Sequence, residues 1–388
     1  MAQFLFFAFD LTEASQIRRI QSLRALGHDV RSAAFRRSNM NTDFEPDWPN
    51  IELGSIENER FFRRSFGMLR GLVRVMRHSE SWRDADVIIA RNFDLLAIGW
   101  SARLLLRRRK IPLVYECLDI HRLLTDSGPV GRIIRWCERQ LLRQVQLLIV
   151  SSPRFVSAYF KDIQRYDGSF AIIENKLWFD ADALARPKVK SDRPANVPLT
   201  LGWVGSIRCA PSLRLLLAAA DQMGPAVRLK IHGNVHRHAL PGFDAEVAVR
   251  DNVSYHGAYQ YPNDLASIYG ESDLVWAQDL WQRGGNSDWL LPNRIYEASW
   301  FGCPQIAVAD TETGRRIASD GLGLTIDAPT PAALVAALEK LEPKDITRMQ
   351  RHILNLEDER FRLRESDIAR ALSPVIGSPP HRRIVEEE

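Results

Sequence analysis

The sequence predicts an α/β protein made of two doubly wound, Rossmann-like domains that face each other across a cleft. The chain has 388 residues, of which 45% are hydrophobic and 26% are charged, which suits two domains of ordinary size. Short apolar runs alternate with amphipathic stretches, as in parallel sheets with helices on both faces. A charged, proline-rich stretch at 185–198 interrupts this alternation and predicts a linker between the domains.

The N-terminal domain is predicted to cover residues 1–184. Its expected strands are the apolar runs at 4–9, 30–35, 51–56, 86–90, 111–116, 147–151 and 171–174. Its expected helices are the stretches at 13–26, 60–78, 95–108, 131–143 and 153–160. The first apolar run lacks a preceding positive charge, and Asp10 and Glu13 follow at once, so it predicts a buried strand rather than a signal peptide.

The C-terminal domain is predicted to cover residues 199–344. Its expected strands are 199–204, 227–231, 253–256, 274–277, 305–308 and 324–326, and its expected helices are 212–220, 262–269, 293–300, 314–319 and 331–341. A long polar helix is expected at 345–370, within a helical segment 345–376 that packs back toward the N-terminal domain; 377–388 is expected to be a disordered tail. Ligands of such sheets bind at the carboxyl ends of the strands, so two facing domains predict a cleft where two substrates meet.

Arginines cluster at 60–78, although the net charge of the chain is only +4. The six are Arg60, Arg63, Arg64, Arg70, Arg74 and Arg77. With the apolar residues between them they predict a basic amphipathic helix that binds an anionic membrane surface; a core-packed helix with an arginine face is the alternative. No apolar stretch approaches the roughly 18 residues of a membrane span. We therefore expect a cytoplasmic protein, peripheral at the inner face of the plasma membrane. No nucleic-acid partner is expected, because aromatic residues do not interleave with the charges.

Several common motifs are absent. There is no G-x-G-x-x-G, no P-loop and no G-x-S-x-G, which argues against nicotinamide enzymes, nucleotide triphosphatases and serine hydrolases. The four cysteines lie far apart and are interpreted as buried thiols. His232, His236 and His238 lie close together, but no carboxylate or cysteine accompanies them. We therefore expect no metal site and no cofactor.

The most informative stretch is 289–308. Pro292 and Asn293 suit the start of a helix, Arg294 falls in its first turn, and Glu297 lies one turn later. Gly302 suits the end of that helix. A helix N-terminus presents free N–H groups and the positive end of the helix dipole, so with an added arginine it predicts a phosphate site.

The pattern Pro292-Asn293-Arg294-x-x-Glu297, followed by Gly302-x-Pro304, resembles the donor-site motif of the large retaining GT-B glycosyltransferase family, which includes many exopolysaccharide and lipopolysaccharide enzymes. The stretches 84–119, 199–208 and 252–279 resemble three further blocks of that family in the same order. Within the family the sequence looks closest to enzymes of succinoglycan-type exopolysaccharide assembly. The resemblance implies the GT-B fold and metal-independent transfer of a hexose, with retention, from a UDP- or GDP-linked donor to a saccharide or polyprenyl-linked saccharide acceptor.

The resemblance also implies roles for individual residues. Glu297 would contact the ribose of the nucleotide, and Arg208 and Arg294 would neutralise the diphosphate, with Arg214 as a weaker substitute for Arg208. The implied donor-binding residues are Gly205, Ser206, Gly284, Gly285, Asn293 and Glu297. The two glycines at 284 and 285 would let backbone amides approach the sugar or the phosphate. The candidates for catalysis are Asp119, Arg208, Arg294 and Asp288.

Two departures from the family pattern leave alternatives open. Trp289 stands where the family has its first glutamate, so either Asp288 takes that role after a one-residue shift or the donor sugar is contacted differently. The histidine that often follows the fifth strand is missing, and Asp119, with His121 nearby, is the acceptor-side candidate; capping the next segment is its alternative role. A non-catalytic GT-B-fold binding protein and a GT-B-like sugar-nucleotide epimerase are the other functions considered.

Overall fold

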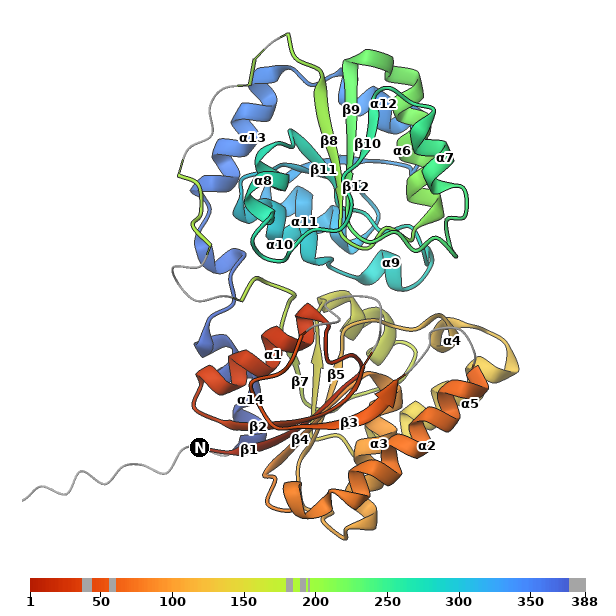
Figure 1. The fold of residues 1–388 in the computed structure, drawn as a ribbon, viewed down its shortest axis with the longest axis vertical. Coiled ribbons are helices and arrows are strands. Elements are labelled where there is room, and N and C mark those ends of the chain that lie inside the picture. Colours follow the sequence, from red (N-terminus) through yellow and green to blue (C-terminus); the bar gives the residue numbers. More distant parts are fainter. Residues whose placement is uncertain (37–43, 56–60, 179–183, 189–192, 195, 377–388) are drawn as a thin grey trace, which may run out of the picture.

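The computed structural model describes residues 1–388 except for 37–43, 56–60, 179–183, 189–192, 195 and 377–388. The expected tail at 377–388 therefore lies outside the described residues, as do parts of the expected linker. The described part folds into two α/β domains, one above the other in the view of Figure 1. No helix in this described part is long and apolar enough to cross a membrane.

The N-terminal domain is built on a parallel sheet of seven strands in the order β3-β2-β1-β4-β5-β6-β7. The strands are β1 (Gln3–Ala8), β2 (Asp29–Arg36), β3 (Asn50–Ser55), β4 (Val87–Arg91), β5 (Leu113–Cys117), β6 (Leu147–Val150) and β7 (Phe170–Ile172). Every residue of β4, β5 and β6 is buried, as the continuous apolar runs predict for strands covered on both faces.

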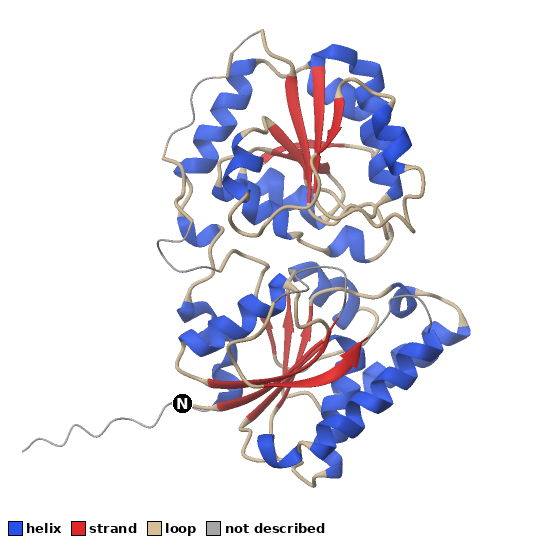
Figure 2. Ribbon diagram, viewed as in Figure 1, coloured by secondary structure: helices blue, strands red, loops and turns tan. Residues whose placement is uncertain are grey.

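Helices cover both faces of this sheet (Figures 1 and 2). The helical segments are α1 (Ala14–Ala25), α2 (Phe61–Arg77), η1 (Ser79–Trp82), α3 (Asn92–Leu105), α4 (Arg122–Thr125), α5 (Pro129–Leu142) and the π-helical η2 (Phe155–Lys161). Side chains that alternate along the strands divide the core in two. Leu5, Phe7 and Ile88 pack with α2, α3 and α5, whereas Phe4 and Ile89 pack with α1 and the last helix of the chain.

The C-terminal domain repeats this plan on a parallel sheet of six strands in the order β10-β9-β8-β11-β12-β13. The strands are β8 (Leu199–Val204), β9 (Val227–His232), β10 (Val253–Tyr255), β11 (Leu274–Trp276), β12 (Gln305–Val308) and β13 (Gly323–Ile326). The helical segments are α6 (Ala210–Met223), η3 (Gly224–Ala226), α7 (Phe243–Ala248), α8 (Leu265–Gly270), α9 (Asn286–Trp289), α10 (Asn293–Trp300), α11 (Glu312–Asp320) and α12 (Pro331–Glu339).

The prediction of one long helix at 345–370 is wrong. The segment forms two helices, α13 (Pro343–Asn355) and α14 (Glu365–Ile376), with the short η4 (Asp358–Arg360) between them. The break is held by the backbone of Leu177, which accepts a hydrogen bond from the N–H of Leu363 at 2.8 Å and donates one to Phe361 at 2.9 Å. Helix α13 packs on α10, and α14 packs on α1 and β6. The end of the chain thus returns to the N-terminal domain.

Candidate functional site

The loops that follow β5 and β6 meet the C-terminal domain at α9. Asp119, two residues after β5, accepts a hydrogen bond from Nδ2 of Asn286 at 3.1 Å. Oδ1 of Asn286 accepts one from the N–H of Ile120 at 2.8 Å. Ser152, after β6, donates its hydroxyl proton to the carbonyl of Trp289. The candidate site lies at this contact, where the ends of N-terminal strands face the other domain.

Charged side chains from both domains converge on Asp119. Burial by the surrounding protein raises the pKa of the Asp119 carboxyl, whereas the positive charge of Arg208 and the hydrogen bond from Asn286 lower it. Glu13, before α1, and Asp279, after β11, raise it further. The helix that follows, α4, is capped by the His121 side chain, which accepts from the N–H of Leu123. The capping role considered for Asp119 is thus filled by another residue.

A glycine loop after β8 carries Arg208. Gly205 has a φ of +115°, and a Cβ added there would meet no atom within 4 Å, so its backbone borders open space. Its neighbour Gly233, after β9, has no such freedom, because a Cβ there would lie 1.8 Å from the carbonyl oxygen of Gly205. The side chain of Ser206 is hydrogen-bonded to that of His236, with 2.9 Å between Oγ and Nε2. Arg208, in the same loop, is exposed, and its charge lies near Asp119.

The N-terminus of α10 has no side-chain cap. Its first residue, Asn293, follows the extended Pro292, and no side chain caps the first turn, although the N–H of Ile295 donates to the carbonyl of Pro292 at 3.1 Å. Arg294 is half-buried, and its Nη1 donates a hydrogen bond to the carbonyl of Trp276, at the end of β11, at 3.2 Å. A cation and a helix N-terminus without a side-chain cap therefore lie together, which is an arrangement that suits a phosphate.

Glu297, one turn along α10, is only 5% exposed. Its Oε2 accepts a hydrogen bond from the hydroxyl of Tyr269 at 2.9 Å. Burial raises the pKa of Glu297, and the charges of Arg18 and Arg294, with the Tyr269 hydrogen bond, oppose that rise. Arg18 belongs to α1 of the other domain and was not identified from the sequence. Both domains thus contribute charge to the surroundings of this carboxyl.

Asp288 has a different environment from the other predicted acids. Its Oδ2 accepts a hydrogen bond from the N–H of Gly284 at 2.7 Å, and its Oδ1 lies 2.7 Å from Nη1 of Arg283. The neighbouring Gly285 lies against Thr125 of the N-terminal domain, with 3.6 Å between its Cβ position and that side chain. Asp288 and the amide of Gly284 are therefore engaged with each other in this loop.

Residues 18–164 match the family described as Glycosyl transferase 4-like domain. Over 346 residues the chain is 35% identical to the succinoglycan biosynthesis protein ExoL of Rhizobium meliloti (strain 1021), covering 88% of this chain and 85% of that protein. The chain belongs to the GT-B glycosyltransferase family.

Solved structures agree with this assignment at the level of the fold. The sucrose-phosphate synthase of Thermosynechococcus elongatus is similar with a TM-score of 0.69 and 16% identity, covering 95% of this glycosyltransferase and 97% of that chain. HepE of Anabaena in complex with UDP is similar with a TM-score of 0.68 and 16% identity, covering 96% of this chain and 100% of that chain. WaaG, a glycosyltransferase involved in lipopolysaccharide biosynthesis, is similar with a TM-score of 0.64 and 16% identity, covering 97% of this chain and 100% of that chain. The predicted two-domain GT-B fold is confirmed.

One buried charge cluster of this glycosyltransferase was not found from the sequence. Glu116, the fourth residue of β5, is fully buried. It pairs with Nε of Arg19 at 2.6 Å and with Nε of Arg91 at 2.8 Å. Burial alone would raise the pKa of Glu116, but the two arginines outweigh it and hold the pKa at about 2. The signals were an acid at the end of one apolar run and an arginine at the end of another, as in IPLVYE and DVIIAR.

The histidines singled out in the sequence lie at the end of β9 and in the loop after it. His232 stacks on His256, with ring centroids 4.5 Å apart, and His236 lies 5.6 Å from His238. Within the described residues, no three His, Cys, Asp or Glu side chains come close enough to hold a metal ion.

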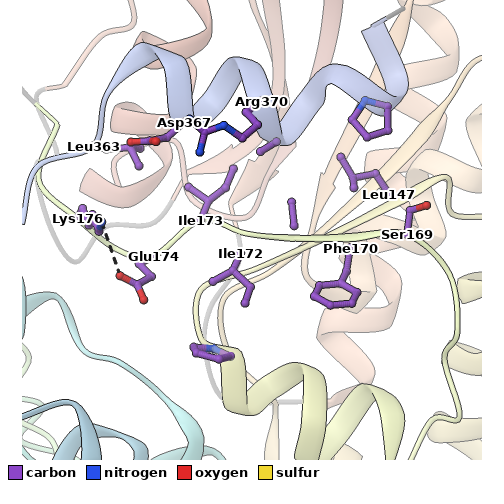
Figure 3. Close-up of a pocket in the computed structure, with 14 residues that line it drawn as sticks. Leu147, Ser169, Phe170, Ile172, Ile173, Glu174, Lys176, Leu363, Asp367 and Arg370 are labelled. Atoms are coloured by element: carbon purple, nitrogen blue, oxygen red, sulfur yellow. Dashed lines mark ion pairs between the residues drawn. The ribbon is translucent and has the colours of Figure 1, made fainter. Parts of the chain in front are cut away.

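A hollow of about 580 Å³ lies between β7 and α14, apart from this site (Figure 3). Its lining is mixed: apolar residues such as Phe170, Ile172 and Leu363 alternate with charged ones, and Lys176 and Glu174 lie 4.0 Å apart at its end. It contains none of the predicted donor or catalytic residues.

Proposed function

We propose that this glycosyltransferase moves a hexose from a UDP- or GDP-linked donor to a saccharide or polyprenyl-linked saccharide in bacterial exopolysaccharide or lipopolysaccharide synthesis. The observation that carries the proposal is the uncapped N-terminus of α10, with Arg294 and the buried Glu297 beside it. Arg208 and Asp119 lie close to each other at the neighbouring contact between the domains. The kinship with ExoL supports the pathway, and the complexes of HepE with UDP and with UDP-glucose support the donor class.

The difficult step in such a transfer is departure of the diphosphate. Negative charge grows on the leaving phosphate while the sugar becomes oxocarbenium-like, so fixed cations and N–H dipoles stabilise the transition state. Arg294, Arg208 and the N-terminus of α10 fill this role, and Glu297 accepts hydrogen bonds from the ribose. Asp119 contacts the acceptor side. The acceptor hydroxyl attacks from the leaving-group face, so the configuration of the sugar is retained.

Binding of UDP, GDP and their sugars, measured by calorimetry, tests this assignment. Glu297→Gln, Arg294→Ala and Arg208→Ala should each weaken binding of the bare nucleoside diphosphate by roughly tenfold or more, because each removes an interaction with a charged group. Asp288→Ala should spare that affinity and reduce transfer, since Asp288 shapes the Gly284 loop. Glu246→Gln, at an exposed position in α7 of the same domain, is the control. Unchanged affinity in Glu297→Gln would place the nucleotide elsewhere, and nucleotide binding without any transfer would favour a non-catalytic binding protein.

Metal independence is part of the proposal. The arginines and the helix N-terminus supply the positive charge that a divalent cation supplies in metal-dependent enzymes. Transfer should therefore continue in EDTA after the enzyme has been freed of metal. Loss of activity in EDTA, with recovery on adding Mg²⁺ or Mn²⁺, would show that the arginines do not suffice.

The same enzyme works at an anionic bilayer through α2 and α5 of the N-terminal domain. The side chains of α2 are described from Gly67 onward. The side chains of residues 61–66, among them Arg63 and Arg64, lie outside the described part, and so does Arg60. One face of α2 packs into the core, as the alternative interpretation expected, through Met68, Leu72, Val75 and Met76. The opposite face exposes Leu69 and Val73 among Arg70, Arg74 and Arg77.

Helix α5 adds a second apolar stripe on the same side of the domain. Val130, Ile133 and Trp136 are each more than half exposed, and Arg132 lies among them, also exposed. Both α2 and α5 pack against α3, and the two helices lie on the same side of the N-terminal domain (Figure 1). Apolar side chains ringed by arginines match the boundary between anionic headgroups and acyl chains. An enzyme attached there reaches a polyprenyl-linked acceptor.

A further inference from the structure

The side chain of Arg18 makes a contact between the two domains. It lies on α1 of the N-terminal domain and is 7% exposed. Its Nη1 donates a hydrogen bond to the hydroxyl of Tyr261 at 2.9 Å, and its guanidinium carbon lies 5.3 Å from the centroid of that ring. The next residue, Arg19, turns inward to Glu116 of its own domain. A buried cation inserted across a domain boundary is costly unless something there uses its charge.

The charge of Arg18 acts on Glu297. That carboxyl is faced by Arg18 from α1, by Tyr259 and Tyr261 from the loop before α8, by Tyr269 from α8, and by Arg294 from its own helix. Within the C-terminal domain, Tyr269 supplies a hydrogen bond, while Arg294 directs Nη1 at the carbonyl of Trp276. Arg18 is the strongest of the charges that oppose the effect of burial on Glu297.

We propose that Arg18 is a positioning residue of the donor site, inserted by the N-terminal domain against Tyr261 so that the Glu297 carboxylate is held ready to accept hydrogen bonds from the ribose hydroxyls. This inference rests on the donor role given to Glu297 above. It adds that donor affinity depends on the contact between the domains, because the cation that supports the ribose-binding acid belongs to the domain that does not bind the nucleotide.

The physical reason is the protonation state of Glu297. An ionised carboxylate only accepts hydrogen bonds, so it can bind two ribose hydroxyls, whereas the protonated acid uses one oxygen as a donor. Burial raises the pKa of Glu297, and Arg18 opposes that rise. Removing the cation therefore raises the pKa further. Donor binding should then be lost at a higher pH than in the parent enzyme.

The experiment is calorimetric titration with UDP from pH 5 to 8 for the parent, Arg18→Gln, Arg18→Lys and Arg24→Gln. Arg24 is on the same helix but pairs with Asp47 at the surface, so Arg24→Gln is the matched control and should equal the parent. Arg18→Gln should weaken UDP binding about tenfold at neutral pH, the usual scale for losing a charged partner. The pH below which affinity falls should also rise. Arg18→Lys keeps the charge and should restore that pH, even if part of the affinity stays lost.

Tyr261→Phe provides a second variant that leaves Arg18 in place. It removes the hydroxyl that accepts from Arg18 but keeps the ring, so it should weaken UDP binding severalfold without removing the cation. The inference is overturned if Arg18→Gln leaves both the affinity and its pH dependence unchanged while Glu297→Gln loses UDP binding. It is also overturned if Arg18→Gln weakens binding equally at every pH. If Glu297→Gln itself binds UDP normally, the donor assignment fails instead.

Discussion

Glu116 is the residue on which the carboxyl end of β5 depends. It is completely buried, and each of its oxygens pairs with a different arginine, Arg19 from α1 and Arg91 from the end of β4. Such a cluster costs desolvation for three charges, so removing one member leaves the others uncompensated. Because Asp119 lies two residues after β5, this cluster also fixes the strand that positions the proposed acceptor-side acid.

Replacing Glu116 with Gln should lower the free energy of unfolding by about 3–5 kcal/mol, the range for breaking a buried ion pair. Urea unfolding measures this, and Glu52→Gln, at an exposed position on β3 of the same domain, should change stability by less than about 0.5 kcal/mol. The ordinary pKa of a glutamate in an unfolded chain is about 4.3, against about 2 for Glu116 in the fold. Its contribution is therefore complete above that unfolded value and is lost as the pH falls toward 2.

The parent should thus lose more stability between pH 5 and pH 2 than Glu116→Gln does. Equal loss in the two proteins would mean that other carboxylates carry the acid sensitivity.

The residues that the sequence proposes for the candidate site stand at element ends, and those that it missed make their contacts with distant elements. Asp119 and Arg294 could be found because a strand end and a helix start are visible in the chain. Arg18 and Glu116 could not, because their partners lie in other elements and only the fold brings them together. The spacing between Asp288 and Glu297 along the chain does not reveal the contact of Asp288 with Arg283.

At the scale of elements, prediction succeeded where local signals set the boundaries. Helix α10 and strand β12 begin and end as expected, because proline starts the helix, Gly302 ends it with a φ of +65°, and Pro304 precedes the strand. The helix expected at 345–370 is broken because Leu177, far away in the sequence, pairs with the backbone at 361–363. No local pattern in a charged helical stretch records such a contact.

Helices α2 and α5 are expected to attach the enzyme to anionic membranes. The parent should co-sediment with liposomes containing phosphatidylglycerol at low salt and be released at high salt. Changing Arg70, Arg74 and Arg77 to Gln should abolish this, because each basic residue near such a surface contributes about 1 kcal/mol and three therefore change the binding constant by about a hundredfold.

The control for this triple variant removes the same charge from the other domain, at the exposed Arg228, Arg348 and Arg351. It should sediment like the parent. Trp136→Ser should weaken attachment by removing apolar area from α5, whereas Val249→Ser, at an exposed apolar position of the C-terminal domain, should not. Unchanged sedimentation of the α2 triple variant would contradict attachment through this helix.

At the scale of the whole molecule, polar contacts join the segments that follow β5, β6 and β7 to helices α9 and α11 of the C-terminal domain. These include Asn286 with Asp119 and Ile120, Ser152 with Trp289, and Arg316 with Glu174. Polar interfaces between domains normally permit relative motion. The alternation of strands and helices predicted both sheets, but it does not reveal these contacts, because Asn286 on α9 and Arg316 on α11 meet N-terminal residues that are far away in the sequence.

Asn286 makes two of these contacts, so it is expected to hold the two domains closed. It is 5% exposed, accepts from the N–H of Ile120 at 2.8 Å and donates to Asp119 at 3.1 Å. Asn286→Ala removes both hydrogen bonds, each of about 1 kcal/mol, which shifts the balance between closed and open domains by roughly tenfold or more. The radius of gyration from small-angle X-ray scattering of the ligand-free enzyme should increase. In Asn252→Ala, which loses two hydrogen bonds inside the C-terminal domain, it should stay unchanged. An unchanged radius in both variants would mean that other contacts, with Arg18–Tyr261 among them, hold the domains together without Asn286.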